Sequence, residues 1–91
     1  MTLARLPAPH PQVIFTEIDD GSGVLLHLDT KFYFTLNATG VVVWKALGEG
    51  ADSTAITERI VEGFRVTKDV AERDVATVVE QLRVEGLVTT R

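Results

Sequence analysis

Residues 24–47 read VLLHLDTKFYFTLNATGVVVWKAL, and this stretch decides the fold. In Val24–Asp29, apolar side chains alternate between two faces, which predicts a strand. Thr30–Lys31 predicts a short reversal, and Phe32–Leu36 then predicts a second, aromatic strand. The stretch shows no active-site constellation of side chains. It therefore favours a protein that works by binding.

A helix follows the aromatic strand directly. Asn37 has a side chain suited to capping the helix N-terminus, and the apolar spacing predicts a helix over Ala38–Leu47. Gly48–Gly50 is the expected stop. Gly40 weakens the first turn by up to about 1 kcal/mol relative to Ala, unless it permits close packing. Trp44 is expected in the core between this helix and the sheet.

One more strand is expected upstream. Val13–Ile18 is β-branched and aromatic, and the Asp- and Gly-rich turn at Asp19–Gly23 leads into the strand at Val24–Asp29. Short connections join neighbours in space, so the three strands predict an antiparallel meander in chain order. That order places Phe32–Leu36 at an edge of the sheet.

Residues 1–12 contain all three prolines of the chain. Pro fixes φ and lacks an N–H donor, so this segment predicts an extended and flexible arm. Residues 13–91 are then expected to form one domain, because a chain of 91 residues is a typical single-domain length.

Two further helices complete the pattern. Ser53 is the expected cap of a helix over Thr54–Phe64, and Thr67 the expected cap of a helix over Lys68–Glu85 that Gly86 ends. Three strands followed by three helices predict an α+β domain with a winged-helix-like, three-stranded antiparallel sheet.

Composition excludes several classes of protein. The chain has no Cys, which rules out disulfides, a thiolate nucleophile and Cys-bound zinc. Its longest apolar run is Val41–Trp44, far short of the ~20 residues that cross a bilayer. The N-terminus lacks the apolar run of a secretory signal. A soluble, cytoplasmic domain is expected.

The sequence offers little for catalysis, metals or cofactors. His27 and Asp29 share a strand face and could form half a metal site, but a surface or interface histidine is the simpler reading. Neither Gly21–Gly23 nor Gly48–Gly50 matches a phosphate loop. We therefore expect no catalytic residue, no metal and no cofactor.

Three binding functions remain. A winged-helix regulator would insert its last helix into DNA, but Lys68–Glu85 carries five acids against three bases, which disfavours nucleic acid. A structural module could pair two copies through the exposed edge; a monomer or a weak homodimer is expected. Alternatively, a partner peptide adds a strand at Phe32–Leu36, an edge that carries no charge or Pro to block pairing.

The ordered set of motifs over residues 13–88 resembles the PqqD-like family, the precursor-peptide recognition elements of ribosomally made, modified peptides. The matching features are the LLHLDT-KFYFTLN double strand, Asn37, Thr39–Gly40, Trp44 and the closing Leu82 with Glu85–Leu87. The segment FYFTLNATG is similar in sequence to the same segment of stand-alone members, including those of lasso-peptide pathways. This resemblance implies a winged-helix variant that performs no chemistry.

The resemblance also implies a partner and a site. A leader peptide would dock as an antiparallel strand on Phe32–Leu36, in a groove beside the last helix, and be held for a radical SAM enzyme or a leader protease. Tyr33 and Thr35 are expected on the groove, Phe34 in the core, and Phe32 in either place. On the helix, the apolar residues could line the groove or lie in the core, whereas the polar ones would contact the leader. The candidate peptide-binding residues are Phe32, Tyr33, Phe34, Thr35, Arg73, Asp74, Val75, Val78, Gln81 and Leu82.

Overall fold

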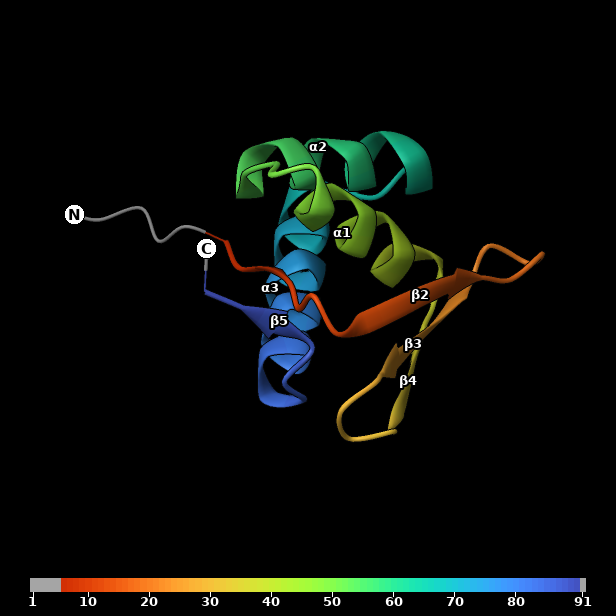
Figure 1. The fold of residues 1–91 in the computed structure, drawn as a ribbon. Helices are drawn as coiled ribbons and strands as arrows, with labels where there is room; N and C mark the ends of the chain where they lie inside the picture. Colours follow the sequence, from red (N-terminus) through yellow and green to blue (C-terminus); the bar gives the residue numbers. More distant parts are fainter. Residues whose placement is uncertain (1–5, 91) are drawn as a thin grey trace.

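The computed structural model describes residues 6–90 and shows a small sheet packed on three helices (Figure 1). The strands are β1 (Ala8–Pro9), β2 (Val13–Glu17), β3 (Gly23–His27), β4 (Tyr33–Leu36) and β5 (Val88–Thr89). The helices are α1 (Ala38–Gly48), α2 (Ser53–Phe64) and α3 (Lys68–Val84). The predicted α+β class, with a three-stranded antiparallel sheet before three helices, is confirmed.

The main sheet has the predicted order, β2-β3-β4, with both pairs antiparallel. The register aligns Phe15, Leu25 and Phe34 in one row across the strands, and this face is turned toward the helices. The neighbouring row of Ile14, Leu26 and Tyr33 lies on the opposite face. Side chains alternate along a strand, so the register decides which apolar groups enter the core.

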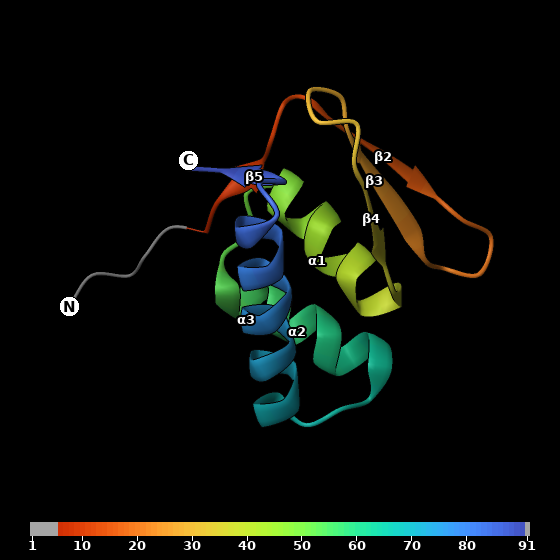
Figure 2. The ribbon, with the colours of Figure 1, turned by 90° about the horizontal axis from the view of Figure 1, so that it is seen from below.

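Helix α1 lies between the sheet on one side and α2 and α3 on the other (Figure 2). Its residues are apolar on several sides, and Val43, Ala46 and Leu47 are completely buried. Trp44 is 6% exposed and belongs to the core, as predicted. The core residues are Leu25, Leu36, Val41, Val43, Trp44, Ala46, Leu47, Ile56, Ile60, Ala71, Val75, Leu82, Leu87 and Val88.

Two of the three predicted helix caps are confirmed and one is wrong. The Asn37 side chain accepts a hydrogen bond from the Gly40 N–H at 2.8 Å, and Thr67 accepts one from the Val70 N–H at 3.3 Å. Helix α2, however, is capped by Asp52, whose carboxylate accepts from the Ala55 N–H, so that Ser53 is its first helical residue. Asp and Ser cap about equally well, so composition alone did not separate neighbouring candidates.

The N-terminal segment differs from a plain arm. Residues Ala8 and Pro9 pair antiparallel with Val88 and Thr89, and the His10 N–H donates to the Leu87 carbonyl at 3.0 Å. These short strands bring the two ends of the described chain together (Figure 1). Residues 1–5 of the expected arm lie outside the described residues. Sequence patterns did not indicate this pairing, since two-residue strands have no periodicity to detect.

His27 was expected as a surface or interface histidine, and the surface placement is wrong, because the residue is only 7% exposed. Its ring lies 4.7 Å, centroid to centroid, from the ring of His10, which the N-terminal segment brings over β3. The His27 Nδ1 atom accepts a hydrogen bond from the Asp29 N–H at 3.2 Å. His27 is also on the same face of β3 as the buried Leu25, so both the sheet register and the His10 ring contribute to its surroundings.

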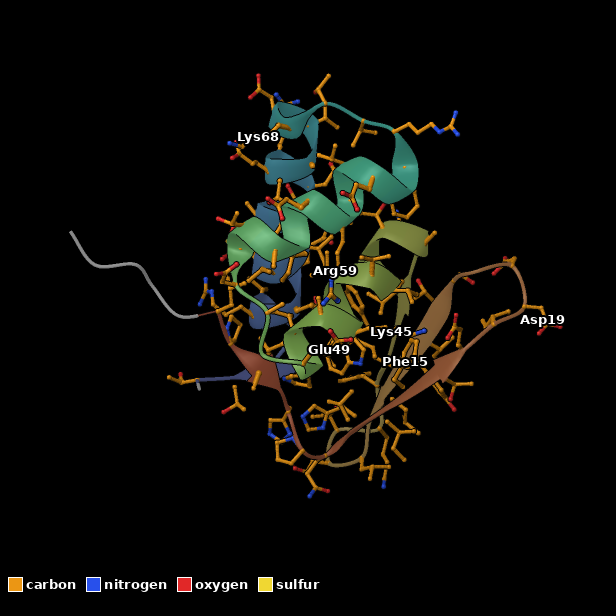
Figure 3. All side chains as sticks on the ribbon, turned by 90° about the horizontal axis from the view of Figure 1, so that it is seen from above. Phe15, Asp19, Lys45, Glu49, Arg59 and Lys68 are labelled. Carbon is orange, nitrogen blue, oxygen red and sulfur yellow. The ribbon has the colours of Figure 1, made fainter. Side chains whose placement is uncertain are left out.

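Surface ion pairs link the helices to their neighbours. Figure 3 shows Lys45 of α1 reaching toward β2, where its Nζ atom lies 2.7 Å from the Glu17 carboxylate and 5.9 Å from the centroid of the Phe15 ring. Arg59 of α2 meets Glu49, just after α1, also at 2.7 Å. Such exposed pairs each contribute about 0–1 kcal/mol, so apolar burial dominates the stability. Among the described helices, none has the length and apolar character to span a membrane.

Substitution of Asn37 by Ala should lower the free energy of unfolding by about 1 kcal/mol, because the first turn of α1 loses its capping acceptor. Urea denaturation would measure this change. Asn37→Asp is the matched control and should remain close to wild type, since its carboxylate can accept the same bond. Equal losses in both variants would show that the cap is not the source of the effect.

Candidate functional site

The second edge of β4 is free: within residues 6–90 no strand pairs with it. The His27 N–H donates to the Phe32 carbonyl, and bonded and non-bonded pairs alternate along an antiparallel ladder. With the observed register, the backbone groups of Phe34 and Leu36 therefore point toward β3, while those of Tyr33 and Thr35 point toward the free edge. This edge presents unused donors and acceptors at every second residue.

A cleft of about 280 Å³ separates β4 from α3. Its wall on the strand side consists of Phe34, Thr35 and Leu36. Its wall on the helix side consists of Asp74, Thr77, Val78 and Gln81. The first turn of α1, with Asn37, Thr39 and Gly40, joins the two walls. Asp74 is the one ionisable residue among those that line the cleft, so the cleft is mostly neutral.

Gly40 lies where β4 meets α1, and a side chain there would be tightly packed. A Cβ atom at this position would lie 3.0 Å from Leu36 Cδ2 and 3.2 Å from Leu36 Cβ. The absence of a side chain thus allows the first turn of α1 to pack against the end of β4, which is the close packing that the sequence left open.

Five of the ten predicted peptide-binding residues line the cleft: Phe34, Thr35, Asp74, Val78 and Gln81. Phe32 and Tyr33 are not among the lining residues and are 75% and 72% exposed; Tyr33, expected on the groove, lies in the outer row of the sheet with Leu26. Arg73 is exposed and is not among the lining residues. The sequence did not predict Thr77 of α3, or the first turn of α1 with Thr39, as part of the cleft. One signal was available for the turn: Asn37, as a helix cap, indicates that α1 begins directly after the strand.

The apolar residues of α3 divide between core and cleft. Val75 and Leu82 are buried at 3% and 0% exposure, whereas Val78 is half-buried and lines the cleft. The apolar stripe along α3 could not separate core residues from cleft residues in the sequence, because the stripe is wide enough to contact both regions.

The outer row of the sheet adjoins the same edge. Ile14 is 49% exposed and Tyr33 is 72% exposed, and Leu26 lies between them across the strands. We call Ile14, Leu26 and Tyr33 the outer face. Exposed apolar rows of this kind mark interaction surfaces more often than isolated exposed side chains do.

The carboxylates with a shifted pKa lie outside the cleft, and they do not form an acid–base pair suited to catalysis. The pKa of Asp20 is lowered because the Ser22 hydroxyl and N–H donate to its carboxylate. The pKa of Glu80 is lowered because the Arg83 guanidinium donates to it from one turn further along α3. Both carboxylates are on the surface. Among the described residues, no group of three or more His, Asp or Glu side chains could hold a metal ion.

The chain belongs to the PqqD family. The family model described as coenzyme PQQ synthesis protein D matches residues 22–88, which include β4, α1 and α3. The match therefore covers the whole cleft. Among curated proteins, none matches the chain closely enough to count as a relative.

Two solved structures resemble the chain over most of its length. One is TbiB1 in complex with the TbiA(beta) leader peptide, with a TM-score of 0.80 and 32% identity, over 89% of this chain and 93% of that chain. The other is lasso peptide synthetase B1 complexed with the leader peptide, with a TM-score of 0.81 and 25% identity, over 91% of this chain and 96% of that chain. Both similar proteins bind a leader peptide in those structures.

The division of α3 gives a stability test. Leu82→Ala should lower the free energy of unfolding by about 3 kcal/mol, because it opens a cavity in the core. Gln81→Ala, at the next position, should change it by less than about 0.5 kcal/mol, because Gln81 is exposed in the cleft. Urea denaturation of both variants would measure the difference. Similar losses in the two would contradict the assignment of Leu82 to the core and Gln81 to the surface.

Proposed function

We propose that this domain binds the leader region of a ribosomally made precursor peptide and performs no chemistry on it. The free edge of β4 beside the cleft is the observation that carries the proposal. Membership of the PqqD family and the two similar leader-peptide complexes support it. A cleft lined by one ionisable residue supports binding over catalysis.

Strand addition is the mode of binding that the edge favours. Tyr33 and Thr35 direct their backbone N–H and C=O groups outward, so an extended leader can form main-chain hydrogen bonds with alternate residues of β4. Main-chain bonds supply affinity that depends little on the leader sequence. Side chains on the inner side of the leader then enter the cleft and provide selectivity.

The cleft is sized for peptide side chains. Its volume of about 280 Å³ is near the lower end of the roughly 300–1,000 Å³ typical of ligand sites. Phe34, Leu36 and Val78 offer apolar contact, and Asp74 and Gln81 offer polar contact at the α3 wall. A leader segment with an apolar side chain facing the sheet and a hydrogen-bond donor facing α3 fits this lining.

The similar proteins support a proposal about the pathway and the partner. Because one neighbour is a lasso peptide synthetase component, we place this domain in a lasso-type pathway in which a leader protease, rather than a radical SAM enzyme, receives the bound precursor. The outer face adjoins the edge that would hold the leader, so the protease is proposed to dock there. The domain would act as a monomer in the cytoplasm.

DNA readout by α3 is the weaker alternative. The helix carries four acidic side chains against three basic ones, and its surface would repel phosphate. Pairing of two copies through β4 would compete with leader binding for the same edge, so added leader would dissociate such a dimer.

Thr35→Pro should weaken leader binding about tenfold. The substitution removes one outward-facing N–H donor but leaves the β3 ladder intact, and Pro is tolerated at a strand edge. Fluorescence polarisation with the labelled leader peptide encoded beside the gene would measure the affinity. Thr35→Val keeps the N–H and the size of the side chain and should bind nearly as wild type. Equal affinity of the Pro variant would exclude pairing at this edge.

Ile14→Ser tests the outer face separately. It should leave leader affinity unchanged, since Ile14 is on β2, but slow leader cleavage by the partner protease several-fold by weakening apolar docking. Cleavage of the precursor would be followed by mass spectrometry at saturating leader. Thr16→Ser, on the same strand and face, removes only one methyl group and is the control. Unchanged cleavage by the Ile14 variant would place the protease elsewhere.

A further inference from the structure

Asp74 brings one negative charge to the cleft beside β4, where no other lining residue is ionisable. The residue is half-buried, and within residues 6–90 no Lys, Arg or His side chain lies within ion-pair distance of it. Two other carboxylates of α3, those of Glu72 and Glu80, do have a lysine or arginine partner on the same helix. The described part of the chain therefore leaves the charge of Asp74 uncompensated.

Binding of a leader would change the surroundings of this carboxylate. A strand added to the free edge of β4 would cover the cleft and displace water from Asp74. Removal of water from a carboxylate is costly unless a cation or hydrogen-bond donors take its place. Thr39, Thr77 and Gln81, which also line the cleft, are neutral and cannot cancel the charge. The compensating cation then has to come from the leader itself.

The two walls of the cleft run in opposite directions. Figures 1 and 2 both show β4 running toward the start of α1, whereas α3 runs the other way. Asp74 is therefore opposite the Leu36 end of the strand, and Gln81 is opposite the Phe34 end. A leader that pairs antiparallel with β4 has the same direction as α3, so its earlier residues meet Asp74 and its later residues meet Val78.

The spacing along α3 matches the spacing along a strand. Asp74 and Val78 are one turn apart, which is about 6 Å along the helix axis. Side chains on one face of a strand recur at every second residue, about 7 Å apart. Two successive inward-facing side chains of the leader can therefore contact Asp74 and Val78 in turn.

We propose that Asp74 selects leaders that carry a lysine or arginine two residues before an apolar side chain. This inference rests on the proposed function and specifies which leaders the cleft accepts. The cation replaces the water that Asp74 loses, and the apolar side chain contacts Val78 and Phe34. An acidic residue at the position of the cation would be repelled. Main-chain pairing gives affinity for many sequences, and this charge contact distinguishes among them.

Asp74→Asn tests the charge contact. Asn keeps the size and shape of the side chain but not its charge, so affinity for the leader peptide encoded beside the gene should fall about tenfold in fluorescence polarisation. Asp69→Asn is the matched control, because Asp69 is exposed on the same helix and does not line the cleft. It should bind as wild type. Unchanged affinity of the Asp74 variant, or equal weakening by both variants, would overturn the proposal.

A double-mutant cycle locates the partner cation. Each lysine and arginine of the leader is replaced by Gln, one at a time. One of these replacements, two residues before an apolar residue, should weaken binding to the wild-type protein about tenfold and have little effect on binding to Asp74→Asn. A leader without a cation at that spacing, or losses that add for every replacement, would contradict the assignment.

Charge reversal provides a test by gain of binding. Asp74→Lys should bind the encoded leader at least about tenfold more weakly, and a leader with Glu in place of the partner cation should recover most of that affinity. No recovery in an Asp74→Lys variant with the wild-type melting temperature would refute the charge contact.

The same measurements separate this inference from the proposed function. Leader binding that does not respond to any Asp74 variant would remove the charge contact and leave leader recognition in place. Absence of leader binding by the wild-type protein would remove both.

Discussion

The burial of α1 is the constraint on which the rest of the structure depends. The helix is apolar on several sides, so it is stable only with the sheet on one side and α2 and α3 on the other. Only Asn37 separates β4 from α1, and Gly40 lets the first turn pack against Leu36. Burying α1 therefore also determines where the edge of β4 lies relative to α3.

This arrangement buries one face of the three-stranded sheet and leaves its other face and one edge exposed. The inner row packs on α1 and is unavailable to partners, while the edge of β4 and the outer face remain exposed. A chain of 91 residues thus keeps a free strand edge and an exposed sheet face apart from its buried core.

Long, periodic elements were predictable, and so was the edge position of β4, because chain order with short turns permits few sheet topologies. Helix caps were predictable except where Asp52 and Ser53 compete, since both side chains can accept the same bond. The pairing of Ala8–Pro9 with Val88–Thr89 was missed, and with it the burial of His27. Those contacts join the two ends of the chain, and no local pattern records them.

By itself, the sequence determined the order of strands and helices, the absence of cysteine chemistry and the uncharged character of the β4 edge. These properties follow from local composition and periodicity. Only the tertiary structure decided that Leu82 lies in the core while its neighbour Gln81 lines a cleft. The reason is physical. The sequence of a helix shows which of its sides is apolar, but what lies opposite each residue depends on how distant segments of the chain pack.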